Sequence, residues 1–251
     1  MKTFMTLLTR EMKSYFYSPI AYVVLFYFLL LMGFNTWALI SASNGYPVEV
    51  TLVQQFFSGA IFWFPFILVF PLITMRVFSE EFRMGTIESL TTAPVGDLQI
   101  VLSKLTGTFL FSCLLLLPSL LFFVFYTKVS GHAAANATGA FGTCYFLLVL
   151  MSLFYCSIGC LASALTKDQV SAAMVSFTTI TLLLFLGFIF DIANVTLPVA
   201  RDVQSYVSPV GHMADFSKGI IDSRPVVYYL TMTALTTFLT FQVFQYRKWK
   251  A

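Results

Sequence analysis

Six long apolar stretches dominate this sequence and leave few choices of fold. They cover about residues Ile20–Ile40, Leu52–Met75, Leu105–Tyr126, Phe141–Leu165, Val170–Phe190 and Val226–Tyr246. A helix needs roughly 20 apolar residues to cross the hydrocarbon core of a bilayer, so each stretch is long enough to span a membrane. Backbone polar groups in a bilayer must be satisfied internally, and a helix does this within one segment. The sequence therefore predicts an all-α membrane protein with six transmembrane helices.

The overall composition supports a membrane protein and excludes some partners. Of the 251 residues, 59% are hydrophobic and only 10% are charged, whereas soluble domains carry roughly 25% charged residues. The formal net charge of +3 is too small to indicate binding to nucleic acid. The even spread of the apolar stretches favours a single transmembrane domain over residues 1–251. No small-residue cleavage site follows the first stretch, so we expect it to remain as a span.

Residues 1–17 precede the first span and predict an amphipathic helix. One face would carry Phe4, Met5, Leu8, Met12, Tyr15 and Phe16, and the other Lys2, Thr6, Thr9, Arg10 and Lys13. Such a helix suits the membrane interface, with its basic residues toward anionic lipid. Glu11 is misplaced among the apolar residues. Either it lies at an edge from which its carboxylate reaches water, or it pairs with a cytoplasmic arginine such as Arg76.

The distribution of basic residues predicts the orientation of the chain. With a cytoplasmic N-terminus, the inner segments carry ten of the 14 Lys and Arg residues, and the outer segments carry only Lys128, Arg201, Lys218 and Arg224. Cytoplasmic loops of membrane proteins are enriched in Lys and Arg. We therefore expect both termini, and the polar segment Arg76–Lys104 between the second and third spans, to face the cytoplasm.

Several kinds of site are disfavoured by the residues present. There is no GxxxxGK[ST] motif, so we expect no nucleotide bound by a P-loop. Both histidines, His132 and His212, fall outside the spans, and the spans hold almost no acids. These features argue against intramembrane proteases and proton-coupled transporters. The four cysteines match no zinc pattern. The sequence therefore predicts a non-enzyme without a metal or cofactor of its own, and any transport by it would draw energy from outside the chain.

The fourth span carries small residues at helical spacing. Ser152, Cys156, Cys160 and Ala164 recur every four residues, and Gly159 and Ser163 form a second small pair. Stripes of small residues allow two helix backbones to approach closely in a membrane. We interpret this stripe first as a packing face and only secondarily as the lining of a pathway.

The segment Arg76–Lys104 is the polar exception between apolar spans, and it has an ordered pattern. Gly85 permits a tight bend, Thr86 can cap a following helix, and Glu88 would lie in the first turn of that helix, where an acid is favourable. Pro94 would end this helix near Thr92, and Asp97 could cap the third span. The alternative is a merely solvated loop between two spans.

This pattern, E-x-x-x-G-T-x-E-x-L-x-x-x-P from Glu81 to Pro94, resembles the cytoplasmic loop of ABC-2 type transporter permeases. Within that family the segment is most similar to the gliding-motility-associated (GldF-like) subgroup. A second similarity, from Ser208 to Asp222, is to the outer segment before the last span in that subgroup. The resemblance implies a coupling surface at Glu80, Glu81, Arg83, Gly85, Thr86, Glu88, Leu90 and Pro94. It also implies an outer segment, residues 191–225, marked by Pro209, His212, Phe216, Gly219 and Asp222.

The resemblance also implies partners and an activity. The chain would be a permease subunit in a bacterial inner membrane, and a separate cytoplasmic ABC ATPase subunit would bind ATP and Mg²⁺. A second permease copy or a paralogue would complete the membrane unit, with the second and fifth spans facing its centre and passing an amphipathic or lipid-like cargo. The alternative is mechanical transmission, without transport, to a partner protein on the outer side through residues 191–225.

Overall fold

The computed structural model describes residues 2–43, 52–87, 96–122, 124, 138–192 and 206–250, and all regular structure in these ranges is helical. The elements are α1 Lys2–Phe16, α2 Pro19–Ser43, α3 Leu52–Ser58, α4 Ala60–Thr74, α5 Ser79–Met84, α7 Asp97–Leu116, α9 Thr138–Leu165, α10 Gln169–Ile192, α12 Pro209–Phe216 and α13 Ser223–Lys250. Six helical segments are long and apolar enough to cross a membrane. The prediction of an all-α protein with six spans is confirmed.

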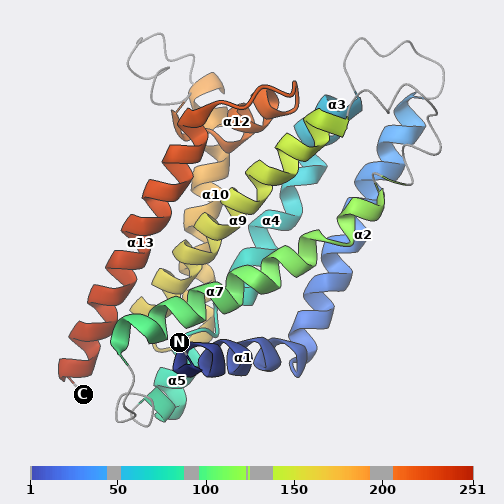
Figure 1. Ribbon diagram of the computed structural model, residues 1–251. Helices are drawn as coiled ribbons and strands as arrows, with labels where there is room; N and C mark the ends of the chain where they lie inside the picture. The colour runs from blue at the N-terminus through green and yellow to red at the C-terminus, as the bar shows by residue number, and fades with distance from the viewer. Residues whose placement is uncertain are drawn as a thin grey trace.

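The spans lie side by side as one bundle whose two ends differ (Figure 1). We call one end the base: there α1 lies across the direction of the spans, α5 lies beside it, and both chain ends are found. The opposite end, the top, carries the short helices α3 and α12. An even number of spans returns the chain to the side where it began, so both termini lie at the base.

Two predicted span boundaries are wrong. The second apolar stretch is divided at Gly59, which adopts an extended conformation between α3 and α4. The third span begins at Asp97, not at Leu105. Residues 97–104 are polar enough to resemble a loop, and only half of them are strong helix formers. The last eight residues of the Arg76–Lys104 segment nevertheless form the first two turns of α7.

The small-residue stripe of α9 lies at the centre of the bundle. Ser152, Cys156, Cys160 and Ala164 are at most 2% exposed. On the same helix, a Cβ atom added at Gly159 would lie 2.0 Å from Thr74 Oγ1, so α4 and α9 approach closely at this point. The interpretation of the stripe as a packing face is confirmed.

Helix α1 packs its apolar face against protein. The Tyr15 ring stacks on Phe111 of α7 with centroids 4.7 Å apart. The Tyr15 hydroxyl donates to the Ile73 carbonyl at 3.1 Å and lies 3.0 Å from Thr108 Oγ1. Burial raises the pKa of Tyr15 well above its ordinary value, so this phenol remains a neutral donor. Helix α1 is thus attached to α4 and α7 as well as to the first span.

Candidate functional site: a buried charge cluster at the base of the bundle

Four charged side chains meet at the base, and we refer to Arg10, Glu11, Glu81 and Lys104 as the charge cluster. Its centre is Lys104, whose side chain is 2% exposed. The Lys104 ammonium lies 3.1 Å from Glu11 Oε1 and 2.9 Å from Glu81 Oε1, and it donates to the Val77 carbonyl at 2.8 Å. An ammonium has three N–H donors, so all three have an acceptor here.

Arg10 completes the cluster from the solvent side. One of its guanidinium nitrogens lies 2.9 Å from Glu81 Oε1 and 3.2 Å from Glu11 Oε1, and its side chain is half exposed. The four residues come from α1, α5 and α7, which converge at the base in Figure 1. Removing one partner from a buried ion pair leaves an uncompensated charge, which is strongly destabilising. The cluster therefore binds these three helices to one another.

The cluster decides between the two interpretations of Glu11. The carboxylate forms ion pairs, as one interpretation required, but its partners are Lys104 and Arg10 and not Arg76. Lys104 is available because it lies in the second turn of α7, where that helix packs on α1. The contact is close: a Cβ atom added at Gly107 would lie 3.0 Å from Glu11 Cβ.

Helix α5 and the turn before it are also held by α9 and α13. Ser163 Oγ accepts hydrogen bonds from the backbone amides of Phe78 and Ser79, both at 3.0 Å. The Arg247 guanidinium lies 4.7 Å from the centroid of the Phe82 ring. It also donates to the carbonyls of Leu165 and of Thr166, the latter at 3.1 Å, at the end of α9. A movement of α5 would therefore act on four other helices.

The structure places the predicted coupling residues in different environments. Glu81 was expected to be open to a partner, but its carboxylate is turned inward to the charge cluster. Glu80 is partly buried, whereas Arg83, Gly85 and Thr86 are exposed at the end of α5. Gly85 has φ +69°, the left-handed conformation of the predicted tight bend. Glu88, Leu90, Pro94 and most of the helix expected over Thr86–Thr92 lie outside the described residues.

The sequence suggests that Asp97 caps the third span, but in the structure it does not. The residue at the N-cap is Gly96, which makes no side-chain capping bond. Asp97 is the first residue of α7, and its carboxylate accepts a hydrogen bond from Lys248 at 2.8 Å. This pair joins the start of α7 to the last turns of α13, a contact between residues 151 positions apart that local sequence cannot reveal.

The residues predicted in the outer segment build the top of the bundle. Pro209 begins α12 behind the Ser208 cap, and Phe216 near its end is fully buried. His212 is buried with its Nδ1 atom 3.1 Å from the Tyr229 hydroxyl. Gly219 has φ +81°, and Asp222 accepts a hydrogen bond from the Arg224 amide at 3.0 Å, capping α13. Residues 193–205 of the predicted outer segment lie outside the described residues.

Sequence reasoning missed the side chains that hold α5 in place. Lys104 gave the only direct signal, because a lysine at the edge of an apolar stretch needs partners if it is buried. Ser163 was noticed as a small residue and not as a hydrogen-bonding one. Over the described ranges, no three His, Cys, Asp or Glu side chains are grouped as metal ligands would be. The base instead contains ionic and hydrogen-bonded contacts between helices.

Comparison with known proteins gives a consistent family assignment. The family model described as "ABC-2 type transporter" matches residues 2–221. The probable multidrug ABC transporter permease YbhS of Escherichia coli (strain K12) is 27% identical over 143 residues, which is 55% of this chain and 35% of that protein. The protein of the same name from Escherichia coli O157:H7 matches to the same extent. The matched region thus spans about a third of the length of these curated relatives.

Proposed function

The chain belongs to the ABC-2 type transporter family, and from this premise we propose that it is the membrane-spanning permease subunit of an ATP-binding cassette transporter. A separate cytoplasmic ATPase subunit would bind ATP and Mg²⁺ and act on the base of the bundle. A second copy of the chain, or a paralogue, would complete the unit in a bacterial inner membrane. The finer resemblance to the gliding-motility subgroup stays a prediction.

The observation that carries the coupling part of this proposal is the position of α5. Its far end is exposed, with Met84 at 67% and the bend at Gly85 beside it. Its other side is joined to α1 and α7 through the charge cluster and to α9 through Ser163. A force applied to the exposed end would therefore pass through short ionic and hydrogen-bonded contacts into several spans. In this proposal, closure of the ATPases pushes α5 and rocks the spans between two states.

The character of α10, the fifth span, supports an amphipathic or lipid-like cargo. Met174 and Leu182 are more than half exposed along this helix. The hydroxyls of Thr178 and Thr179 donate to carbonyls of their own helix, both at 2.8 Å, so the exposed face is apolar with weakly polar points. The name of the Escherichia coli relative, a probable multidrug permease, agrees with a cargo of this chemical class.

The second candidate function, mechanical transmission to an outer partner, has its own supporting observation. A hollow of about 240 Å³ lies between α3 and α12 at the top. Its apolar floor includes Phe57 and Met213, and its rim includes Gln54 and Lys218. A side chain of another protein could occupy it. ATPase activity that rises with cargo would favour transport, and activity that rises only with an outer partner protein would favour transmission.

Substitution at the exposed end of α5 tests the coupling proposal. The full chain is expressed in its native membrane with its ATPase, and the complex is purified through a tag on the chain. We expect Met84→Arg to abolish co-purification of the ATPase while the chain still inserts. Ile220→Arg, a matched change at a residue 57% exposed at the top, should leave the complex intact. Full complex formation and coupled hydrolysis with Met84→Arg would contradict the proposal. So would a wild-type chain with which no ATPase co-purifies.

A further inference from the structure

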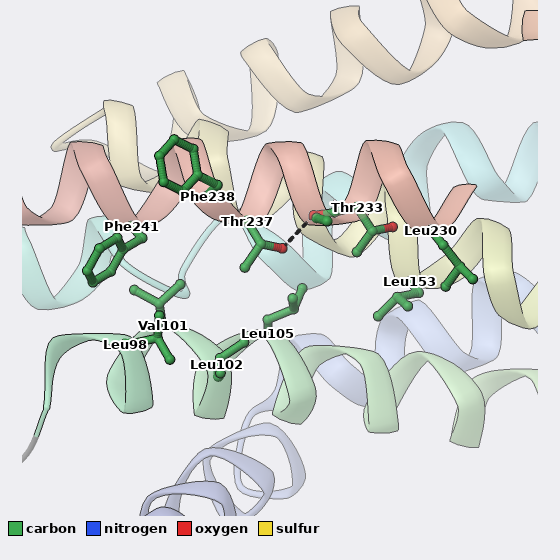
Figure 2. Close-up of a pocket in the computed structure, with 11 residues that line it drawn as sticks. Leu98, Val101, Leu102, Leu105, Leu153, Leu230, Thr233, Thr237, Phe238 and Phe241 are labelled. Atoms are coloured by element: carbon green, nitrogen blue, oxygen red, sulfur yellow. Dashed lines mark hydrogen bonds between the residues drawn. The ribbon is translucent and has the colours of Figure 1, made fainter. Parts of the chain in front are cut away.

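A groove of about 410 Å³ runs along the bundle between α7 and α13, with α9 closing one side (Figure 2). Its walls are mostly aliphatic and aromatic, and they include Leu98, Val101 and Leu105 of α7, Leu230 and Phe241 of α13, and Leu153 of α9. Both α7 and α13 are candidate membrane spans. An occupant of this groove must therefore come from the membrane and be apolar over most of its length.

The few polar atoms in the walls have partners within their own helix. The Thr233 hydroxyl donates to the Tyr229 carbonyl at 2.6 Å, and the Thr237 hydroxyl donates to the Thr233 carbonyl at 2.7 Å, as the dashed line in Figure 2 shows. A polar ligand would lose its hydrogen bonds to water here and gain few in return. The groove is suited to hydrocarbon.

The shape and lining of the groove suit a single hydrocarbon chain. From Leu230 to Phe241 the α13 wall is about 16 Å long, at 1.5 Å per residue. The residues of α13 that line the groove recur at intervals of three and four, so the groove follows the helix axis and matches an extended chain.

A partly exposed ion pair lies beyond one end of the groove, and its cation is Lys248. Leu98 and Phe241 line the end nearest the base, and beyond them Lys248 pairs with Asp97 at 2.8 Å. The Lys248 side chain is 37% exposed, and its ammonium has three donors, of which Asp97 uses one. A phosphate group at this position could accept another. We propose that the groove binds one acyl chain of a membrane phospholipid whose phosphate lies beside Lys248.

This site is independent of the coupling proposal, but its position gives it a structural role. Leu98 follows Asp97, and Leu105 follows Lys104, so the α7 wall of the groove directly adjoins both ionic contacts at the base. A bound chain would fill the space between α7 and α13 on the side away from α1. The lipid would thereby maintain the spacing at which Asp97 and Lys248 meet.

Native mass spectrometry of the full chain, purified in mild detergent, tests the site. We expect one phospholipid to remain bound after the other lipids have been stripped. Ala234 lines the groove, so Ala234→Trp should fill it and lower the retained phospholipid roughly tenfold, because an indole and an acyl chain cannot share the space. Leu235→Trp, next to it on α13 and 52% exposed, adds the same ring outside the groove and should retain the lipid. Thermal unfolding and elution volume confirm that both variants fold.

The headgroup part of the proposal has a separate test. Lys248→Gln should weaken retention of phospholipid while leaving retention of diacylglycerol, which lacks the phosphate, unchanged. Equal phospholipid retention in Ala234→Trp and the wild-type chain would overturn the site, as would a wild-type chain that retains none. If Ala234→Trp instead separates two copies of the chain without any change in bound lipid, the groove is a protein interface and the lipid assignment is wrong.

Discussion

Lys104 is the residue on which the base of the bundle depends most. A lysine ammonium that is 2% exposed costs free energy to bury, and this cost is offset only because Glu11, Glu81 and the Val77 carbonyl all contact it. The two carboxylates depend on Lys104 in turn, since both are less than a fifth exposed. The stability of the cluster is therefore a property of the group and not of any one pair.

This interdependence makes a quantitative prediction. Lys104→Met should destabilise the chain by about 3–5 kcal/mol, because it leaves two carboxylates close together without their main cation. The triple variant Glu11→Gln, Glu81→Gln, Lys104→Met removes the three least exposed charges of the cluster, leaves only the half-exposed Arg10, and should be markedly more stable than the single variant. The free energy of unfolding, measured by denaturant titration in detergent, checks both. A triple variant that costs as much as the sum of its single substitutions would contradict a cooperative cluster.

At the scale of elements, α4 and α9 approach closely at Gly159. Gly159→Ala should force these helices apart, since the new Cβ would lie 2.0 Å from Thr74 Oγ1 and 2.4 Å from Thr74 Cβ. We expect a loss of about 1–3 kcal/mol in unfolding free energy. Gly142→Ala, in the same helix but with no atom within 4 Å of the added carbon, should be neutral or slightly stabilising.

Two further measurements complete this prediction. Removing the Thr74 side chain altogether, by Thr74→Gly in the Gly159→Ala background, should recover part of the packing, because all three clashing atoms are then gone. Thr74→Ala should not, because its Cβ atom remains. If Gly142→Ala destabilises as much as Gly159→Ala, the loss comes from the backbone of α9 and not from its contact with α4.

The elements differ in how far the sequence predicts them. The six spans could be predicted because the need for apolar residues in a membrane is met locally, within each helix. The start of α7 could not, because residues 97–104 are helical through partners far away in the sequence: Lys104 pairs with Glu11 and Asp97 pairs with Lys248. The bend at Gly85 follows from one residue type, so it could be predicted. The contacts that Ser163 and Arg247 make with the α5 region could not be predicted, because they depend on how the helices pack in the bundle.

At the scale of the whole molecule, the two ends of the bundle have different chemistry. The base concentrates the charge cluster, the Asp97–Lys248 pair and the Arg247 contacts, together with both chain ends. The top is closed by α12, whose buried His212 and Phe216 pack among aromatic and aliphatic side chains. The base, with its ionic contacts, is the end suited to contact with a soluble ATPase. The proposed function therefore requires the base to face the cytoplasm, as the excess of Lys and Arg there also predicts.

Labelling of single cysteines in intact cells tests this orientation. An impermeant maleimide added outside should modify Lys218→Cys at the top, whose side chain is about half exposed, and should not modify Met84→Cys at the base until the membrane is opened. The native chain is the background control, because Cys144, Cys156 and Cys160 are buried and Cys113 is partly buried, all within spans. Modification of Met84→Cys from outside, with Lys218→Cys protected, would place α5 on the side where no ATP is available. A cytoplasmic ATPase could then not reach it, and the coupling proposal would fail whatever the family.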